Sequence, residues 1–192
     1  MYHCITFFPV RIKALFVLLI GMIAYVPLAK AKDPVWLLVE TDIGKLSVMR
    51  DNRPVDVFKN IAIGQKGTTK EKLRGDRKTP LGKYRIGWIN SKSRYYRFFG
   101  FNYPSIDDAK RGYYAGIITS QTFRALLRAA YKNLRPGQNT PLGGQLGIHG
   151  LGKGDTALHR KYNWTRGCVA LTNQQVERLS RWIEVGTMVE VR

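Results

Sequence analysis

Cysteine and histidine are both scarce in this chain. Its 192 residues include two cysteines, Cys4 and Cys168, and three histidines. So few thiols exclude the disulfide-rich class of small domains. The spacing of His149, His159 and Cys168 matches no common zinc motif either. We therefore expect neither a metal nor an organic cofactor.

Acidic residues are also few. There are 13 Asp and Glu against 32 Lys and Arg, which gives a formal charge of +19 at pH 7. Such a surface attracts polyanions in general, namely nucleic acids, anionic lipids or cell-wall polymers. The basic residues are scattered, without a long Lys/Arg block and without helix-turn-helix or zinc-finger spacing. We therefore predict no nucleic-acid partner, and the charge alone is also consistent with a solvated surface.

The N-terminal segment has the composition of an export signal. Arg11 and Lys13 precede an apolar run over residues 14–29, an Ala-Lys-Ala sequence ends it, and the segment contains no acidic residue. The run is shorter than the roughly 20 residues that span a bilayer. We predict a signal peptide over residues 1–31 and a mature chain over residues 32–192. The protein is then periplasmic or associated with the cell wall, and an uncleaved membrane anchor is the alternative.

Cleavage of this signal would remove Cys4 and leave Cys168 without a partner. An idle, exposed thiol is a liability in an oxidising compartment, which favours a catalytic role for Cys168. The alternative is a buried cysteine that serves as a small apolar side chain.

The mature chain has the length of one domain and contains neither repeats nor a linker, and we expect a monomer. Short segments rich in β-branched and aromatic residues are separated by Asp, Asn, Gly and Pro. The segments predicted as strands are 35–40, 45–50, 55–64, 83–89 and 186–191.

Two segments have helical periodicity instead. Residues 120–134 place a set of apolar side chains on one face, and we expect this helix to pack on the sheet. The apolar side chains on this face are Phe123, Leu126, Leu127, Ala130 and Leu134. A second helix is predicted to begin at Thr172, where Gln175 completes a capping box. The predicted class is mainly β with two flanking amphipathic helices.

The residues with the clearest chemistry lie between Ile148 and Leu171. A cysteine thiolate attacks carbonyl groups, and an imidazole can take up the thiol proton and return it to a leaving amine. Cys168 and His149 can supply these two groups. Gly167 allows a tight turn, so that the amides of Gly167 and Cys168 could bind a developing oxyanion.

This His-Gly pair, followed by Thr-Arg-Gly-Cys, resembles the L,D-transpeptidase (YkuD-type) catalytic domain family of bacterial cell-wall enzymes. Further similar segments occur in the family's order, and they are residues 72–87, 101–109 and 143–150. The resemblance implies a β-sandwich-like fold. It also implies acyl transfer on peptidoglycan stem peptides, with release of the terminal D-alanine.

The resemblance assigns roles to individual residues. Cys168 is the nucleophile, His149 is the base, and the backbone carbonyl of Gly150 orients the imidazole. Thr165 occupies the Ser/Thr place of the motif, where its hydroxyl can bond within the turn or to substrate. Arg166 could bind a substrate carboxylate or lower the thiol pKa.

The resemblance also places the charged loop over residues 70–82 beside the cleft. Arg74, Asp76 and Lys78 would then face substrate or shape the wall of the cleft. The composition of this segment by itself predicts only a loop.

Several alternatives stay open. His159 is a rival base, although its polar flanks predict a surface loop. The acyl acceptor can be a second stem peptide, a wall-linked protein or water, and water would make the protein an L,D-carboxypeptidase or hydrolase. Sortases differ in their cysteine motif, and NlpC/P60 peptidases place cysteine before histidine. The non-enzymatic alternative is a basic wall-binding protein in which Cys168 is inert.

Overall fold

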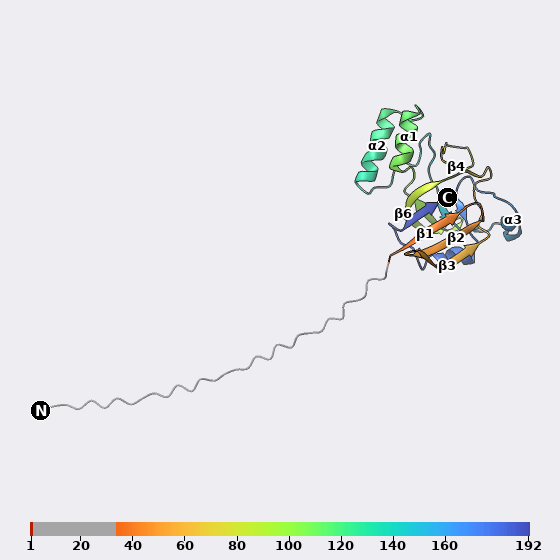
Figure 1. Cartoon of the computed structure of the whole chain (residues 1–192), viewed down its shortest axis with the longest axis horizontal. Coiled ribbons are helices and arrows are strands. Elements are labelled where there is room, and N and C mark those ends of the chain that lie inside the picture. Colours follow the sequence, from red (N-terminus) through yellow and green to blue (C-terminus); the bar gives the residue numbers. More distant parts are fainter. Residues whose placement is uncertain (2–33) are drawn as a thin grey trace. The chain divides into compact units, whose positions relative to one another are not determined.

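The computed structural model describes Met1 and residues 34–192, and the predicted signal peptide lies outside this part apart from its first residue. Residues 34–192 form a mainly β structure, as predicted (Figure 1). Among the described residues, no helix has the length and apolar character needed to cross a membrane.

Ten strands are present in this part of the chain. Their bounds are β1 Val35–Glu40, β2 Lys45–Arg50, β3 Arg53–Lys59, β4 Thr68–Thr69, β5 Thr79–Pro80, β6 Gly82–Ser93, β7 Tyr96–Phe101, β8 Gly147–His149, β9 Val169–Ala170 and β10 Met188–Val191. Eight of them form one sheet in the order β3-β2-β1-β10-β6-β7-β8-β9, and β4 pairs with β5. The segments predicted as strands from composition correspond to β1, β2, β3, β6 and β10.

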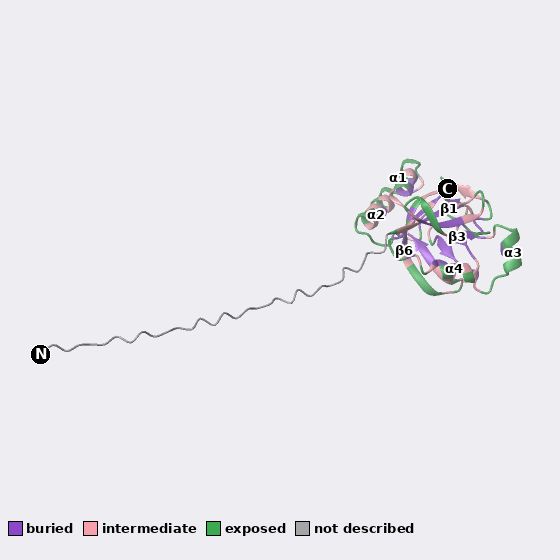
Figure 2. Ribbon diagram, turned by 60° about the horizontal axis from the view of Figure 1, so that its bottom comes forward, coloured by how far each residue is buried: buried purple, intermediate pink, exposed green. Residues whose placement is uncertain are grey.

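Rows of apolar side chains cross the sheet and form its core. Leu37 of β1 is aligned with Val48 of β2 on one side and with Val189 of β10 on the other. All three are fully buried. The alternation of side chains along each strand therefore places one apolar face of these strands together, which accounts for the main hydrophobic cluster (Figure 2).

Helix α2 (Ser120–Tyr131) corresponds to the first predicted helix, but its packing differs from the prediction. It pairs with α1 (Ile106–Tyr114), a helix that the sequence analysis did not predict (Figure 1). The two helices share a small second cluster that contains Ala109 and Leu126. Leu126 is the one buried residue of α2, and Leu134 lies beyond the helix and is exposed. The amphipathic pattern thus serves a helix pair and not the sheet.

Two shorter helices flank the cysteine segment. α4 (Asn173–Leu179) has the predicted capping box between Thr172 and Gln175. Its Val176 and Leu179 belong to the main core cluster. α3 (Thr156–Lys161) replaces the surface loop predicted there, because Asp155 caps it by accepting hydrogen bonds from two backbone amides.

Candidate active site

Parallel pairing of β8 with β9 brings the histidine and the cysteine together. Ile148 is aligned with Val169, so Cys168 lies opposite Gly147. Ile148 and Val169 are both fully buried in the core. Since successive side chains alternate, His149 and Cys168 share the other face, with Cα atoms roughly 8 Å apart from the strand spacings. Residues 19 positions apart in the sequence therefore meet at one site.

The imidazole of His149 is held by the next residue. Its Nδ1 lies 2.7 Å from the carbonyl oxygen of Gly150. A carbonyl oxygen can only accept, so Nδ1 carries the proton and Nε2 keeps its lone pair. A Cβ at position 150 would lie 2.7 Å from Oδ1 of Asn173 and 2.8 Å from the carbonyl oxygen of Tyr95. Glycine is therefore needed for this close approach.

Aromatic rings enclose the same imidazole. Tyr95 stacks on it at a centroid distance of 4.3 Å, Phe98 lies at 6.0 Å, and Trp164 meets it edge-on at 5.7 Å. Burial lowers the pKa of His149 to about 4, and the charges of His159 and Arg94 act in the same direction. The ring is therefore neutral at pH 7 and can accept a proton.

The thiol of Cys168 is only partly exposed, and it is the free cysteine of the described residues. Sγ lies 3.6 Å from the carbonyl oxygen of Gln145, to which the thiol can donate. Burial raises the pKa of the Cys168 thiol to about 11, whereas a hydrogen bond from the Gly147 backbone amide and the charge of Lys72 both lower it. The resting pair is a neutral thiol beside a neutral imidazole.

Lys72 is the residue that sequence reasoning missed here. It is a lysine with 3% exposure, and its ammonium group bonds to Asp76 and, at 3.0 Å, to the carbonyl oxygen of Leu73. Its Cε would lie 3.4 Å from a Cβ built on Gly167. The chain therefore places a fixed positive charge beside the cysteine turn. In the sequence it is one of 32 basic residues, and its one signal is that it begins the family-like segment over residues 72–87.

The turn before Cys168 is held by Thr165. The hydroxyl of Thr165 donates to the carbonyl oxygen of Cys168 at 2.7 Å and accepts from the amide of Gly167 at 3.1 Å. Thr165 is itself buried. Its hydroxyl thus bonds within the turn, which is one of the two roles expected for it, and a contact with substrate stays a prediction.

The amide of Gly167 donates to the same hydroxyl in this structure, and its role toward an oxyanion stays a prediction. Gly167 has φ of 127°, and a Cβ there would lie 2.6 Å from the carbonyl oxygen of Lys78. Glycine is therefore required for the turn and for the close approach of the charged loop.

The other two candidate residues, Arg166 and His159, differ in their exposure. Arg166 is exposed beside the cysteine. His159 is buried, contrary to the solvated surface position predicted for it, and its Nδ1 accepts a hydrogen bond from Nε1 of Trp164 at 3.2 Å. Because α3 turns it inward, His159 contacts the tryptophan that also meets His149.

The charged loop lies beside the cysteine turn, as the resemblance implied. Asp76 accepts hydrogen bonds from the amides of Leu73 and Lys78, both at 2.9 Å. Burial opposes ionisation of Asp76, but these bonds and the one from Lys72 lower its pKa overall. Arg74 is exposed and bonds to Asn139. Asp76 thus stabilises the loop by accepting hydrogen bonds from its backbone amides and from Lys72.

No three His, Cys, Asp or Glu side chains gather as a possible metal site in the part of the chain that the structure describes.

Solved structures with a similar fold include Bd1075 from Bdellovibrio bacteriovorus, with a TM-score of 0.54 and 21% identity over 85% of this chain and 49% of that chain. The helical cell shape determining protein Pgp2 from Campylobacter jejuni gives a TM-score of 0.55 and 23% identity over 83% of this chain and 47% of that chain. This chain thus spans about half the length of these proteins. A search of curated proteins finds no match.

A family model gives the most direct comparison. The model of the L,D-transpeptidase catalytic domain, YkuD, matches residues 34–191. The match covers the charged loop, the His-Gly pair and the cysteine turn. The resemblance inferred from the sequence is confirmed, and this chain belongs to the L,D-transpeptidase catalytic domain family.

Proposed function

We propose that the protein is an exported cysteine acyltransferase that acts on peptidoglycan stem peptides. The observation that carries this proposal is the pairing of β8 with β9, which sets Cys168 and a neutral, oriented His149 on one face. Membership of the family supports peptidoglycan as the substrate.

The first half of the reaction forms a thioester. Nε2 of His149 takes the thiol proton as Sγ of Cys168 bonds to the carbonyl carbon of the third stem residue. The C–N bond to D-alanine then breaks, and Nε2 returns the proton to the leaving amine. Both groups rest neutral, so the imidazole is available to take the thiol proton.

Two features stabilise charge during this step. The Lys72 ammonium and the Gly147 amide favour the anionic sulfur. The amide of Cys168 is our candidate donor to the oxyanion, since the Gly167 amide is already bonded to Thr165. Arg166, exposed beside the turn, is our candidate for a substrate carboxylate.

The second half transfers the acyl group to an acceptor. An amine of a second stem gives a crosslink, a wall-linked protein gives an attachment, and water gives net hydrolysis. In each case His149 accepts a proton from the acceptor and the Cys168 thiol is restored.

The test is intact-protein mass spectrometry of the full chain mixed with a stem tetrapeptide, with released D-alanine measured separately. The wild type and Cys4→Ala should form an adduct or release D-alanine. Cys168→Ala should do neither, and His149→Ala should be slower by about a hundredfold or more. If folded protein with a reduced thiol gives neither an adduct nor released D-alanine, the acyltransferase proposal fails and the wall-binding alternative remains.

A further inference from the structure

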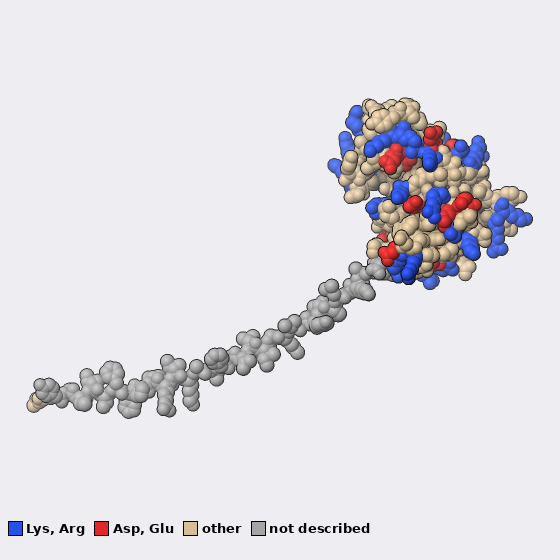
Figure 3. Space-filling model, viewed as in Figure 1, with Lys and Arg blue, Asp and Glu red and all other residues tan. Residues whose placement is uncertain are grey.

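A basic pocket lies beside the candidate active site and is not part of it. It encloses about 660 Å³, and its lining includes Lys59, Lys153 and Arg160 but no Asp or Glu. These cations come from the end of β3, from the loop after His149 and from α3. Within residues 34–192 none of the three has a carboxylate partner. Figure 3 shows Lys and Arg gathered over α3.

The floor of this pocket is held in place by side-chain amides. Oδ1 of Asn173 accepts from the amides of Leu151 and Gly152 at 2.8 and 2.9 Å, and its Nδ2 donates to the carbonyl oxygen of Gly152 at 2.8 Å. Gln175 donates to the carbonyl oxygen of Lys59 at 2.9 Å. These bonds therefore hold the backbone at Lys59 and at Gly152, next to Lys153.

His159 and Asn60 both line the pocket. Nδ1 of His159 accepts from the Trp164 indole, so the neutral ring carries its proton on Nε2. Burial lowers the pKa of His159, and a hydrogen bond to the backbone of Asn60 acts to raise it. The His159 ring is therefore held by groups of the chain and forms part of the pocket wall.

The pocket also neighbours the candidate base. The ring of Trp164 lies 6.4 Å from that of His159, which lines the pocket, and 5.7 Å from that of His149, centroid to centroid. Gly152, which also lines the pocket, follows His149 by three residues. Trp164 therefore contacts both the pocket wall and the candidate base.

We propose that this pocket is an anion-binding subsite that takes a carboxylate of the stem peptide away from the bond that is cleaved. The proposal rests on the proposed function for the identity of the peptide. The absence of acidic lining residues and the three cations without a carboxylate partner carry the choice of an anion.

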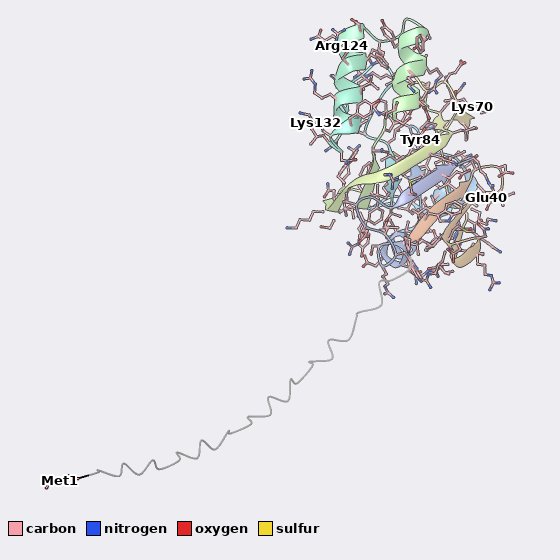
Figure 4. All side chains as sticks on the ribbon, turned by 60° about the vertical axis from the view of Figure 1, so that its left-hand side comes forward. Met1, Glu40, Lys70, Tyr84, Arg124 and Lys132 are labelled. Carbon is pink, nitrogen blue, oxygen red and sulfur yellow. The ribbon has the colours of Figure 1, made fainter. Side chains whose placement is uncertain are left out.

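Binding is measured by calorimetry on full-chain Cys168→Ala, which cannot turn over the stem tetrapeptide. Adding Lys153→Gln and Arg160→Gln should weaken tetrapeptide binding about tenfold or more and reduce its dependence on salt. The matched control adds Arg124→Gln and Lys132→Gln, which remove the same charge from the side of α2 away from α1 (Figure 4). This control should bind almost as tightly as Cys168→Ala. An equal loss of tetrapeptide affinity in the two variants would mean that the effect is general electrostatics, and it would overturn the proposal.

Inorganic phosphate distinguishes a carboxylate from a phosphate ligand. It should compete with tetrapeptide in Cys168→Ala and lose this effect with Lys153→Gln and Arg160→Gln. If phosphate binding depends on Lys153 and Arg160 but the affinity for tetrapeptide does not, the pocket does not bind a stem-peptide carboxylate. The proposal is then overturned in favour of a phosphate polymer as the ligand.

Turnover separates the two proposals. With Cys168 present, the Lys153→Gln and Arg160→Gln variant should release D-alanine with a raised KM and an unchanged kcat. If the wild type releases none but pocket-dependent binding persists, the proposed function fails and the subsite stands. If release is normal and KM is unchanged, the subsite fails and the function stands.

Discussion

Nδ1 of His149 lies 2.7 Å from the carbonyl oxygen of Gly150, and this one contact sets the tautomer of the candidate base. It substitutes for the carboxylate that orients histidine in a Ser-His-Asp triad. The bond to Gly150 acts to raise the pKa of His149, but burial outweighs it and lowers the pKa to about 4, so the ring is neutral at pH 7.

Gly150→Ala should disrupt this contact. The added Cβ would lie 2.7 Å from Oδ1 of Asn173 and 2.8 Å from the carbonyl oxygen of Tyr95, so backbone must move. We expect a loss of about 1–3 kcal/mol in the free energy of unfolding, measured by denaturant titration. Gly137→Ala is the control, since the nearest atom to its Cβ, in Thr140, is 4.0 Å away. Equal stability of the two variants would contradict this account.

The stability of the fold should depend on pH through His149. The unfolded chain protonates this residue near pH 6.5, but the folded chain does so only near pH 4. The unfolded state therefore binds more protons between these values. The free energy of unfolding should fall as pH decreases from about 6.5 to about 4, by up to about 3 kcal/mol, with no contribution from His149 at higher pH.

Denaturant titrations at pH 7.5 and pH 4.5 check this dependence in the wild type and in His149→Gln. The variant should lose less stability between the two pH values than the wild type does. Because the pKa of His159 is also lowered by burial, some pH dependence should remain in the variant. Identical losses in both proteins would remove His149 from the explanation.

The charge of Lys72 should assist ionisation of Cys168. Lys72→Gln combined with Asp76→Asn removes the charged pair without leaving one member buried alone. We expect alkylation of the thiol by iodoacetamide at pH 8 to slow several-fold, because the thiol pKa rises. Lys72→Arg should retain most of the rate. Lys70→Gln, an exposed lysine of the same segment, should retain all of it, and an equal loss there would point to a general charge effect.

Thr165→Val should loosen the cysteine turn. Valine has nearly the shape of threonine but lacks the hydroxyl that bonds to the carbonyl oxygen of Cys168 and the amide of Gly167. The loss should be about 1–3 kcal/mol in the free energy of unfolding, since two buried polar groups lose their partner. Thr165→Ser keeps the hydroxyl and should be less affected. A stable Thr165→Val with reduced affinity for stem tetrapeptide would instead restore a substrate contact.

Local sequence patterns predicted β1 and β2 with their observed bounds, because each strand carries its own apolar residues and turn signals. They also located β6 and β10, although β6 continues to Ser93 and β10 begins only at Met188. The capping box at Thr172 and Gln175 was also predicted, since both partners lie within one helical turn. The helix that packs against α2 was not predicted. Its apolar stripe specifies a buried face, but whether a sheet or α1 covers that face depends on contacts far apart in the chain.

The sequence by itself determined the chemical groups of the candidate site, namely the thiol of Cys168, the imidazole of His149 and the glycines beside them. Tertiary structure decided what surrounds them. Lys72 reaches the cysteine turn, and His159 turns inward to Trp164, only because separate segments pack together. Burial and neighbouring charge then set the pKa values of His149 and Cys168, and neither can be read from residue type or spacing.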